Sequence, residues 1–189
     1  MSSGPLLGPI GRSVWVALVL MLAALPGAGA EDPGLIRSLK VAYLYNFTRF
    51  VQWPRSGADG PFVIAVIGDD RLAEALRLLE REGRRVDDAP IRILRATAVS
   101  AIGDARILFV GTAAGARLEA IRDATAGRPI LLVGDTPGFA GRGVAINFFL
   151  KPDILGEGER LRFAIDPRAL QGRGLKVSAR LYDVAEVLR

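Results

Sequence analysis

The sequence contains neither cysteine nor histidine, and these two absences exclude several kinds of site. Without cysteine the chain can form no disulfide and offers no thiolate nucleophile. Without histidine it has no imidazole for acid–base catalysis and no Ser-His-Asp triad, and the usual zinc ligand sets are missing. Because no cross-link can hold the fold, we expect a hydrophobic core to stabilise it, and 50% of the residues are hydrophobic.

Concentrated positive charge is missing as well. The formal net charge is +5, and the arginines are scattered, with Arg84-Arg85 as the only doublet. A nucleic-acid-binding surface needs a basic patch or stripe, often with aromatic residues between the charges. We therefore expect no nucleic-acid partner.

The first 30 residues have the pattern of a secretory signal peptide. Arg12 precedes an apolar run at residues 14–25, and helix breakers and the small residues Ala28-Gly29-Ala30 follow it. This run is shorter than the ~20 residues that a membrane-spanning helix requires. We predict cleavage after Ala30, export to the periplasm and no membrane insertion of residues 31–189. An uncleaved anchor is the alternative.

Three short apolar runs are typical of strands buried on both faces. They occupy residues 62–69, 107–112 and 130–135, and each ends at glycine followed by aspartate or threonine. Helical patterns follow the first two runs, and residues 91–94 form a shorter candidate strand between them. This alternation predicts an α/β fold, a three-layer sandwich around a mainly parallel central sheet.

The C-terminal third has a different pattern. Residues 144–150 and 160–165 look like strands, and the glycine- and proline-containing turn between them predicts an antiparallel hairpin at the sheet edge. Apolar residues then recur at helical spacing from Val177 to Leu188, which predicts a closing amphipathic helix. Since no linker divides residues 31–189, we expect one domain.

Aromatic side chains are dense in residues 40–54, KVAYLYNFTRFVQWP. On a helix Tyr43, Phe47 and Phe50 share one face, so we interpret this segment as a helix docked on the core. Trp53-Pro54 should end it, because the residue before proline avoids the helical conformation. A helix on a membrane surface is the alternative, although the basic row of such helices is missing.

The outer face of the same helix is a candidate partner surface. Tyr45, Arg49 and Gln52 lie on or beside this face, together with Thr48 and Lys40. They are polar or amphipathic side chains that the core does not need. We expect Tyr45, Arg49 and Gln52 to contact another protein or a second copy of the chain.

A candidate ligand crevice lies where the parallel strands end. Asp69, Thr112 and Asp135 come at the carboxyl ends of three strands, and ligands of open α/β sheets bind outside those ends. The alternative is that Asp69 or Asp70 and Thr112 cap helices. A phosphoacceptor-like acidic pocket with Lys151 as its cation is a further possibility, which export from the cytoplasm disfavours.

The glycine-rich stretch at residues 134–143, GDTPGFAGRG, has the composition of an anion cradle. Known cradles lead into a helix N-terminus, whereas here a strand follows. A turn-rich connection is therefore the first interpretation. In the alternative, Gly138, Gly141, Arg142 and Gly143 grip an anionic ligand.

Taken together, these stretches resemble the YfiR-like family of exported regulatory proteins. The resemblance rests on residues 42–54, AYLYNFTRFVQWP, 66–70, VIGDD, 133–150, VGDTPGFAGRGVAINFFL, and 175–185, LKVSARLYDVA. The matching motif positions are Asn46, Trp53, Pro54, Gly134, Asp135, Gly138, Phe139, Ile146, Asn147 and Phe148. Members commonly carry cysteine pairs, which this chain lacks, so cysteine-based redox control is excluded here.

The resemblance implies regulation rather than catalysis. Such proteins are periplasmic α/β domains, often dimers, that repress a membrane-bound diguanylate cyclase by binding its periplasmic sensor region. We therefore expect a periplasmic repressor, a homodimer that uses no cofactor and controls cyclic di-GMP. Two alternatives are a small-ligand binding protein with the crevice described above, and a Mg²⁺-dependent hydrolase that uses Asp69, Asp70 and Asp135.

Overall fold

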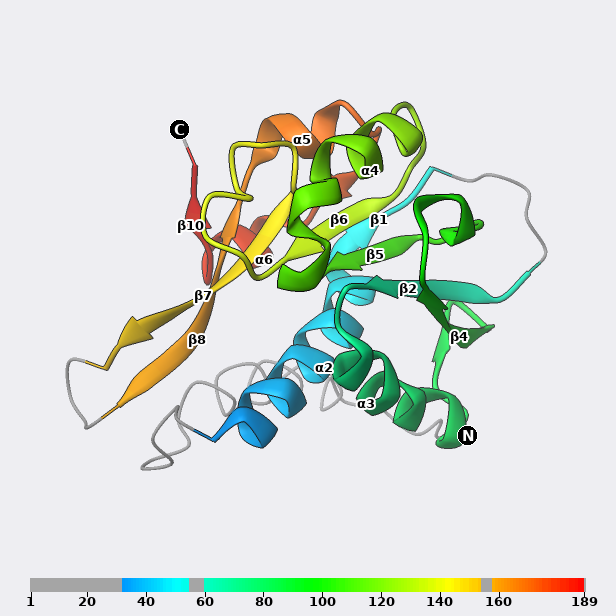
Figure 1. Ribbon diagram of the computed structural model, residues 1–189, viewed down its shortest axis with the longest axis horizontal. Helices are drawn as coiled ribbons and strands as arrows, with labels where there is room; N and C mark the ends of the chain where they lie inside the picture. Colours follow the sequence, from blue (N-terminus) through cyan, green and yellow to red (C-terminus); the bar gives the residue numbers. More distant parts are fainter. Residues whose placement is uncertain (1–31, 55–59, 154–157, 189) are drawn as a thin grey trace, which may run out of the picture.

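The computed structural model describes residues 32–54, 60–153 and 158–188 (Figure 1). The predicted signal peptide and the tip of the predicted hairpin lie outside these residues. Among the described helices, none is both long and apolar enough to span a membrane.

A mainly parallel sheet forms the centre of the molecule. In the described chain its order is β10-β8-β7-β6-β5-β2-β4-β3. The bounds are β2 (Phe62–Ile67), β3 (Arg85–Val86), β4 (Ala89–Ala96), β5 (Ile107–Val110), β6 (Leu131–Gly134), β7 (Ile146–Pro152), β8 (Glu159–Ile165) and β10 (Glu186–Val187). Strands β4, β2, β5, β6 and β7 are parallel to one another, whereas β7 and β8 form an antiparallel hairpin. The predicted parallel sheet and hairpin are confirmed.

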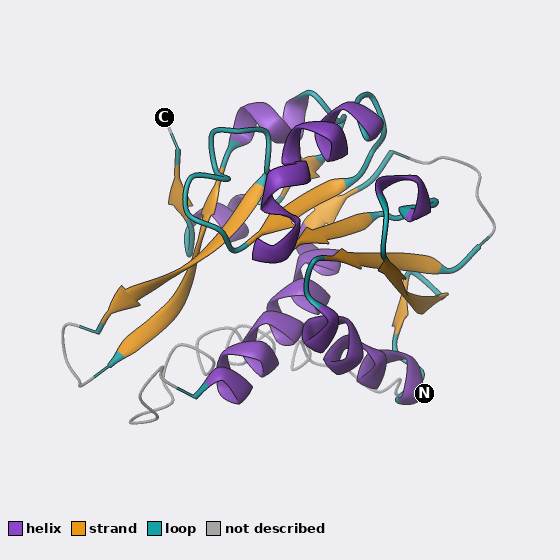
Figure 2. Ribbon diagram, in the orientation of Figure 1, coloured by secondary structure: helices purple, strands orange, loops and turns teal. Residues whose placement is uncertain are grey.

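Helices cover both faces of this sheet. On one face lie α2 (Pro33–Phe50), α3 (Asp70–Arg81), α5 (Pro167–Gln171) and α6 (Ala179–Tyr182), and on the other η1 (Val99–Ala101), η2 (Thr112–Arg117) and α4 (Leu118–Ala124). Figure 2 shows α2 and α3 on the side of the sheet opposite to α4. Strand residues alternate between the two cores, so that Ile64 belongs to the first and Ala65 to the second. The predicted three-layer sandwich is confirmed.

Helix α2 is docked on the sheet by aromatic residues. The ring of Phe47 lies 5.9 Å from that of Phe148 and 5.3 Å from that of Phe163, and Tyr43 contacts the same two rings. Phe47 is 0% exposed, which confirms the interpretation of a core helix. Thr48, expected on the outer face, is instead buried, and its hydroxyl donates to the carbonyl oxygen of Tyr45. That internal bond removes the cost of burying the hydroxyl.

The helix ends three residues before Trp53, at Phe50, because the chain joins a second small sheet. Val51 is extended, and β1 (Val51–Gln52) pairs antiparallel with β9 (Lys176–Val177). The partner strand comes from the other end of the chain, so helical periodicity in residues 40–54 gave no sign of this pairing.

The predicted closing helix is wrong. Only α6, a single helical turn, forms in this region, and β10 follows it and runs parallel to β8. Leu181 is buried as the helical pattern required, but Val184 and Val187 are 44% and 45% exposed. Pairing of Val187 with Ile165 supplies backbone hydrogen bonds that outweigh the weak helical pattern. As a result β10, and not the hairpin, forms this edge of the sheet.

Candidate functional site

The carboxyl edge of the sheet brings together two of the predicted crevice residues. Strands β2, β5 and β6 run in parallel register, and Asp69, Thr112 and Asp135 follow them within two residues of each strand end. The hydroxyl oxygen of Thr112 lies 3.5 Å from Oδ1 of Asp135, and the hydroxyl of Thr136 donates to the hydroxyl oxygen of Thr112 over 3.1 Å. The edge placement predicted from the strand pattern is therefore correct.

Asp69 is the N-cap residue of α3. Its Oδ1 accepts a hydrogen bond of 2.9 Å from the backbone N–H of Leu72, so it caps α3 as the alternative interpretation stated. Thr112 makes no such bond and begins η2 without capping it.

The aspartates proposed for a Mg²⁺ site do not converge. Asp70 is the first residue of α3 and pairs with Arg95, whose Nε lies 2.6 Å from its Oδ1. Asp69 caps α3, and Asp135 pairs with a lysine of α2. In the described ranges, no three acidic, histidine or cysteine side chains lie together as metal ligands.

Lys40 is the cation of this edge, which the sequence analysis did not identify. Its Nζ lies 2.6 Å from Oδ2 of Asp135, and the two side chains are only 14% and 15% exposed. The same Nζ lies 5.7 Å from the centre of the buried Phe109 ring, where a cation is attracted to the aromatic face. The available signal was spacing, since Lys40 precedes Tyr43 by one helical turn and so shares its inward face.

Lys151, the cation suggested for a phosphoacceptor-like pocket, lies elsewhere. It is exposed on β7 and pairs with Glu186 of β10. That suggestion is corrected: the lysine that meets Asp135 comes from α2 and not from the hairpin.

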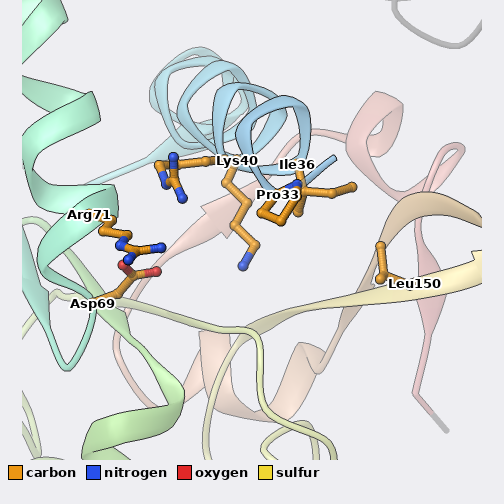
Figure 3. Close-up of a pocket in the computed structure, with 7 residues that line it drawn as sticks. Pro33, Ile36, Lys40, Asp69, Arg71 and Leu150 are labelled. Atoms are coloured by element: carbon orange, nitrogen blue, oxygen red, sulfur yellow. The ribbon is translucent and has the colours of Figure 1, made fainter. Parts of the chain in front are cut away.

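A cavity of about 390 Å³ lies beside the Lys40–Asp135 pair. Its lining comes from α2, from the β2–α3 turn, from the first turn of α3 and from β7, and comprises Pro33, Ile36, Arg37, Lys40, Asp69, Arg71 and Leu150. In Figure 3 the side chain of Lys40 extends from α2 into the space between Asp69 and Leu150. One wall of the cavity is therefore cationic and another apolar, a combination that suits an amphipathic anion.

The glycine-rich loop divides the predicted crevice between the two faces of the sheet. Asp135 turns toward α2, whereas Arg142 pairs with Glu119 of α4 over 3.3 Å. A Cβ atom on Gly143 would lie 2.7 Å from Nε of Arg122, so this arginine of α4 packs on the glycine. The predicted set Asp69, Thr112, Asp135, Gly138, Gly141, Arg142 and Gly143 thus spreads along one edge and does not surround a single space.

The motif residues of the loop hold it against the sheet. Phe139 is 2% exposed, and a Cβ atom on Gly134 would lie 2.7 Å from its ring. The side-chain amide of Asn147 donates to the carbonyl oxygen of Thr136 over 3.1 Å. Only glycine at position 134 leaves room for the ring, which gives this motif position a packing role.

Tyr45 is flanked by two arginines, and contrary to the expectation that the core does not need it, it also packs against the core under α2. The guanidinium carbons of Arg49 and Arg84 lie 5.3 Å and 5.8 Å from the centre of its ring. Arg49 and Gln52 are exposed, and Tyr45 is half-buried. The predicted partner surface is thus an aromatic ring with cations at its rim.

Comparison with known proteins identifies the family. A search of curated proteins found no match. The model of the YfiR/HmsC-like family matches residues 37–186, a range that runs from the first turns of α2 to β10. It includes the stretches on which the sequence resemblance rested. The chain belongs to the YfiR/HmsC-like family.

Proposed function

We propose that this protein is a periplasmic repressor that binds the periplasmic sensor region of a membrane-bound diguanylate cyclase. The observation that carries the proposal is the family match across residues 37–186. YfiR-like proteins are periplasmic, non-catalytic regulators that interact with membrane signalling proteins. The signal peptide predicted for residues 1–30 supports export to the same compartment.

The partner surface in this proposal consists of Tyr45, Arg49 and Gln52. Tyrosine and arginine are enriched at the energetic centres of protein interfaces, because they combine large contact area with polar groups. Here the two arginines beside the Tyr45 ring hold it in place before binding. The surface contacts the sensor region, a second copy of the chain, or both.

The double substitution Tyr45→Ala with Arg49→Ala tests this surface. We expect weaker binding of the purified sensor region or a weaker homodimer, measured by titration calorimetry and sedimentation. Arg168→Ala is the matched control, because Arg168 is an exposed arginine on α5. If both measurements stay unchanged in the double variant, the surface assignment is wrong.

Cellular cyclic di-GMP tests the repressor proposal itself. We expect its concentration to rise when the gene is deleted and to return when the full-length chain is supplied. A version without residues 1–30 should fail to restore it, because the sensor region is reached only after export. An unchanged concentration on deletion would contradict repression of a cyclase.

A second function, binding of a small ligand, is favoured by the cavity beside Lys40. The cavity has the volume of typical small-molecule sites, ~300–1,000 Å³, and polar groups converge on it. A ligand that prefers one conformation of the repressor would shift its equilibrium and carry the envelope signal. A screen of melting temperatures separates ligand binding from metal binding. A melting temperature that rises with Mg²⁺ in the wild type, but not in Asp69→Asn and Asp135→Asn, would favour metal binding over binding of an organic ligand.

A further inference from the structure

We propose that the cavity between α2 and the β2–α3 turn binds a small carboxylate that carries an apolar body. Arg37 and Arg71 hold the carboxylate, and Ile36 and Leu150 contact the apolar part. The inference rests on the second function above, ligand binding, and adds the chemical class of the ligand.

The cationic wall of the cavity contains arginines whose charge is not balanced by an ion pair with a carboxylate in the described part of the chain. Lys40 is balanced by Asp135, and Asp69 uses one carboxylate oxygen to cap α3. Within the described ranges, no ion pair or side-chain hydrogen bond involves Arg37 or Arg71. Both guanidinium groups therefore remain available to an anion that enters the cavity.

The charge balance favours a monoanion. The three cations of the wall stand against the carboxylates of Asp69 and Asp135, which leaves one net positive charge at the cavity. A carboxylate neutralises this charge, whereas a phosphate dianion would exceed it. The planar guanidinium fork also matches the two oxygens of a carboxylate. Lys40 can add a bond, since an ammonium group has three donors and Asp135 accepts from one.

The apolar wall indicates that the ligand is more than a carboxylate. Leu150 is 41% exposed although it faces Ile36 and Pro33 across the cavity. Burial of such surface contributes about 25 cal/mol per Å² of apolar area. A ligand with a short aliphatic or aromatic body would cover Leu150 while its charged end meets the arginines.

Octanoate is a suitable probe for this class. In calorimetric titrations of the exported protein, we expect octanoate to bind at least about tenfold more tightly than acetate or octan-1-ol. Acetate lacks the apolar body and octanol lacks the charge, and tenfold corresponds to about 1.4 kcal/mol, a modest share of either contact. Octyl phosphate tests the charge argument, and tighter binding of octyl phosphate than of octanoate would overturn the carboxylate assignment.

Substitutions locate the site. Arg37→Gln and Arg71→Gln should each weaken octanoate binding about tenfold or more without lowering the melting temperature, since each removes a charge-assisted hydrogen bond. Leu150→Asn should weaken octanoate but leave acetate unchanged. Arg168→Gln on α5, which lies at the top of Figure 1 while α2 and α3 lie at the bottom, is the control and should have no effect.

Two outcomes would overturn the inference. One is the absence of octanoate binding, and the other is equal octanoate affinity in the wild type and both arginine variants. Neither outcome touches the repressor proposal, which the cyclic di-GMP measurement tests separately. A melting-temperature rise with a different ligand would preserve ligand binding in general while the carboxylate class fails.

Discussion

The two faces of the central sheet are built differently. The face under α2 has an aromatic cluster around Phe47 and a largely buried ion pair, Lys40–Asp135. The face under α4 is packed mainly with aliphatic residues such as Leu108 and Leu118, and the ion pairs of Glu119 are exposed there. A single loop, residues 134–143, supplies a charged partner to each face.

This difference shows where the molecule depends on a few side chains. On the α4 face, stability comes from many small aliphatic contacts. The charged side chains there are exposed to water, where ion pairs contribute little to the free energy of unfolding. On the α2 face, a few large rings and one shielded ion pair hold α2. The candidate cavity lies on this second face, where α2 extends beyond the aromatic cluster.

The aromatic cluster offers the strongest test of this comparison. Phe47→Ala should lower the free energy of unfolding by about 3–5 kcal/mol, since it leaves a cavity among three other rings. Leu118→Ala on the opposite face should cost less, although both side chains are 0% exposed. Urea unfolding followed by circular dichroism measures both values. A smaller loss for Phe47→Ala than for Leu118→Ala would remove the contrast between the faces.

The shielded ion pair should be next in size. Asp135→Asn leaves Lys40 without its partner in a site where its side chain is 14% exposed, and should cost about 1–3 kcal/mol of unfolding free energy. Lys40→Met should be milder, because it keeps the apolar stem and leaves Asp135 with the hydroxyl of Thr112 3.5 Å away. The same urea experiment measures both. A cost below about 0.5 kcal/mol for Asp135→Asn would place this pair with the exposed ones.

Tyr43 gives the α2 face a pH dependence at alkaline pH. Burial raises the pKa of Tyr43 above its ordinary value of 10.0, and the nearby Arg162 partly opposes the rise. The unfolded chain therefore loses this proton at a lower pH than the folded protein does. The contribution of neutral Tyr43 to the free energy of unfolding is fully present below pH 10.0, and it is lost as the pH rises through the pKa of Tyr43 in the folded protein.

The measurement is the unfolding free energy of the wild type and of Tyr43→Phe from pH 8 to above pH 11. The wild type should lose stability more steeply than the variant once the pH exceeds the pKa of tyrosine in the unfolded chain. Parallel curves for the two proteins would contradict a raised pKa at this position.

The smallest effect is expected on the α4 face. Glu119→Gln removes the partner of Arg142 and Arg122, but the Glu119 side chain is 70% exposed. We expect a change within about 0.5 kcal/mol, measured by the same unfolding assay and reduced further at high salt. A loss as large as that of Asp135→Asn would mean that solvent exposure does not separate the two pairs.

Local patterns in the sequence were enough to predict most of the layered fold. Uninterrupted apolar runs such as residues 107–110 identify strands buried on both faces, and polar residues at their ends mark one edge of a parallel sheet. These signals lie within a few residues of one another. For that reason the edge position of Thr112 and Asp135 was predictable, as was the cap formed by Asp69.

The failures involve partners that are distant in the chain. The helical spacing from Val177 to Leu188 is real, but the pairing of β10 with β8 decides the conformation of its last residues. Lys40 seemed to belong to a polar face until the fold brought Asp135 beneath it. Periodicity shows which face of a helix or strand is apolar. It does not show which charged residue of a neighbouring element will pair with a residue on that face.

The contacts of α2 have a consequence for the order in which an exported chain can fold. The rings that hold Phe47 are Phe148 and Phe163, and β1, which follows the helix, pairs with β9. These partners come from the last third of the sequence, whereas α3 contacts the helix from nearer in the chain. A chain that leaves a secretion channel amino end first therefore presents this helix long before its docking surface exists. Contacts of such long sequence separation form slowly. Under the proposed export, we expect the aromatic face of α2 to stay undocked until the final strands have emerged.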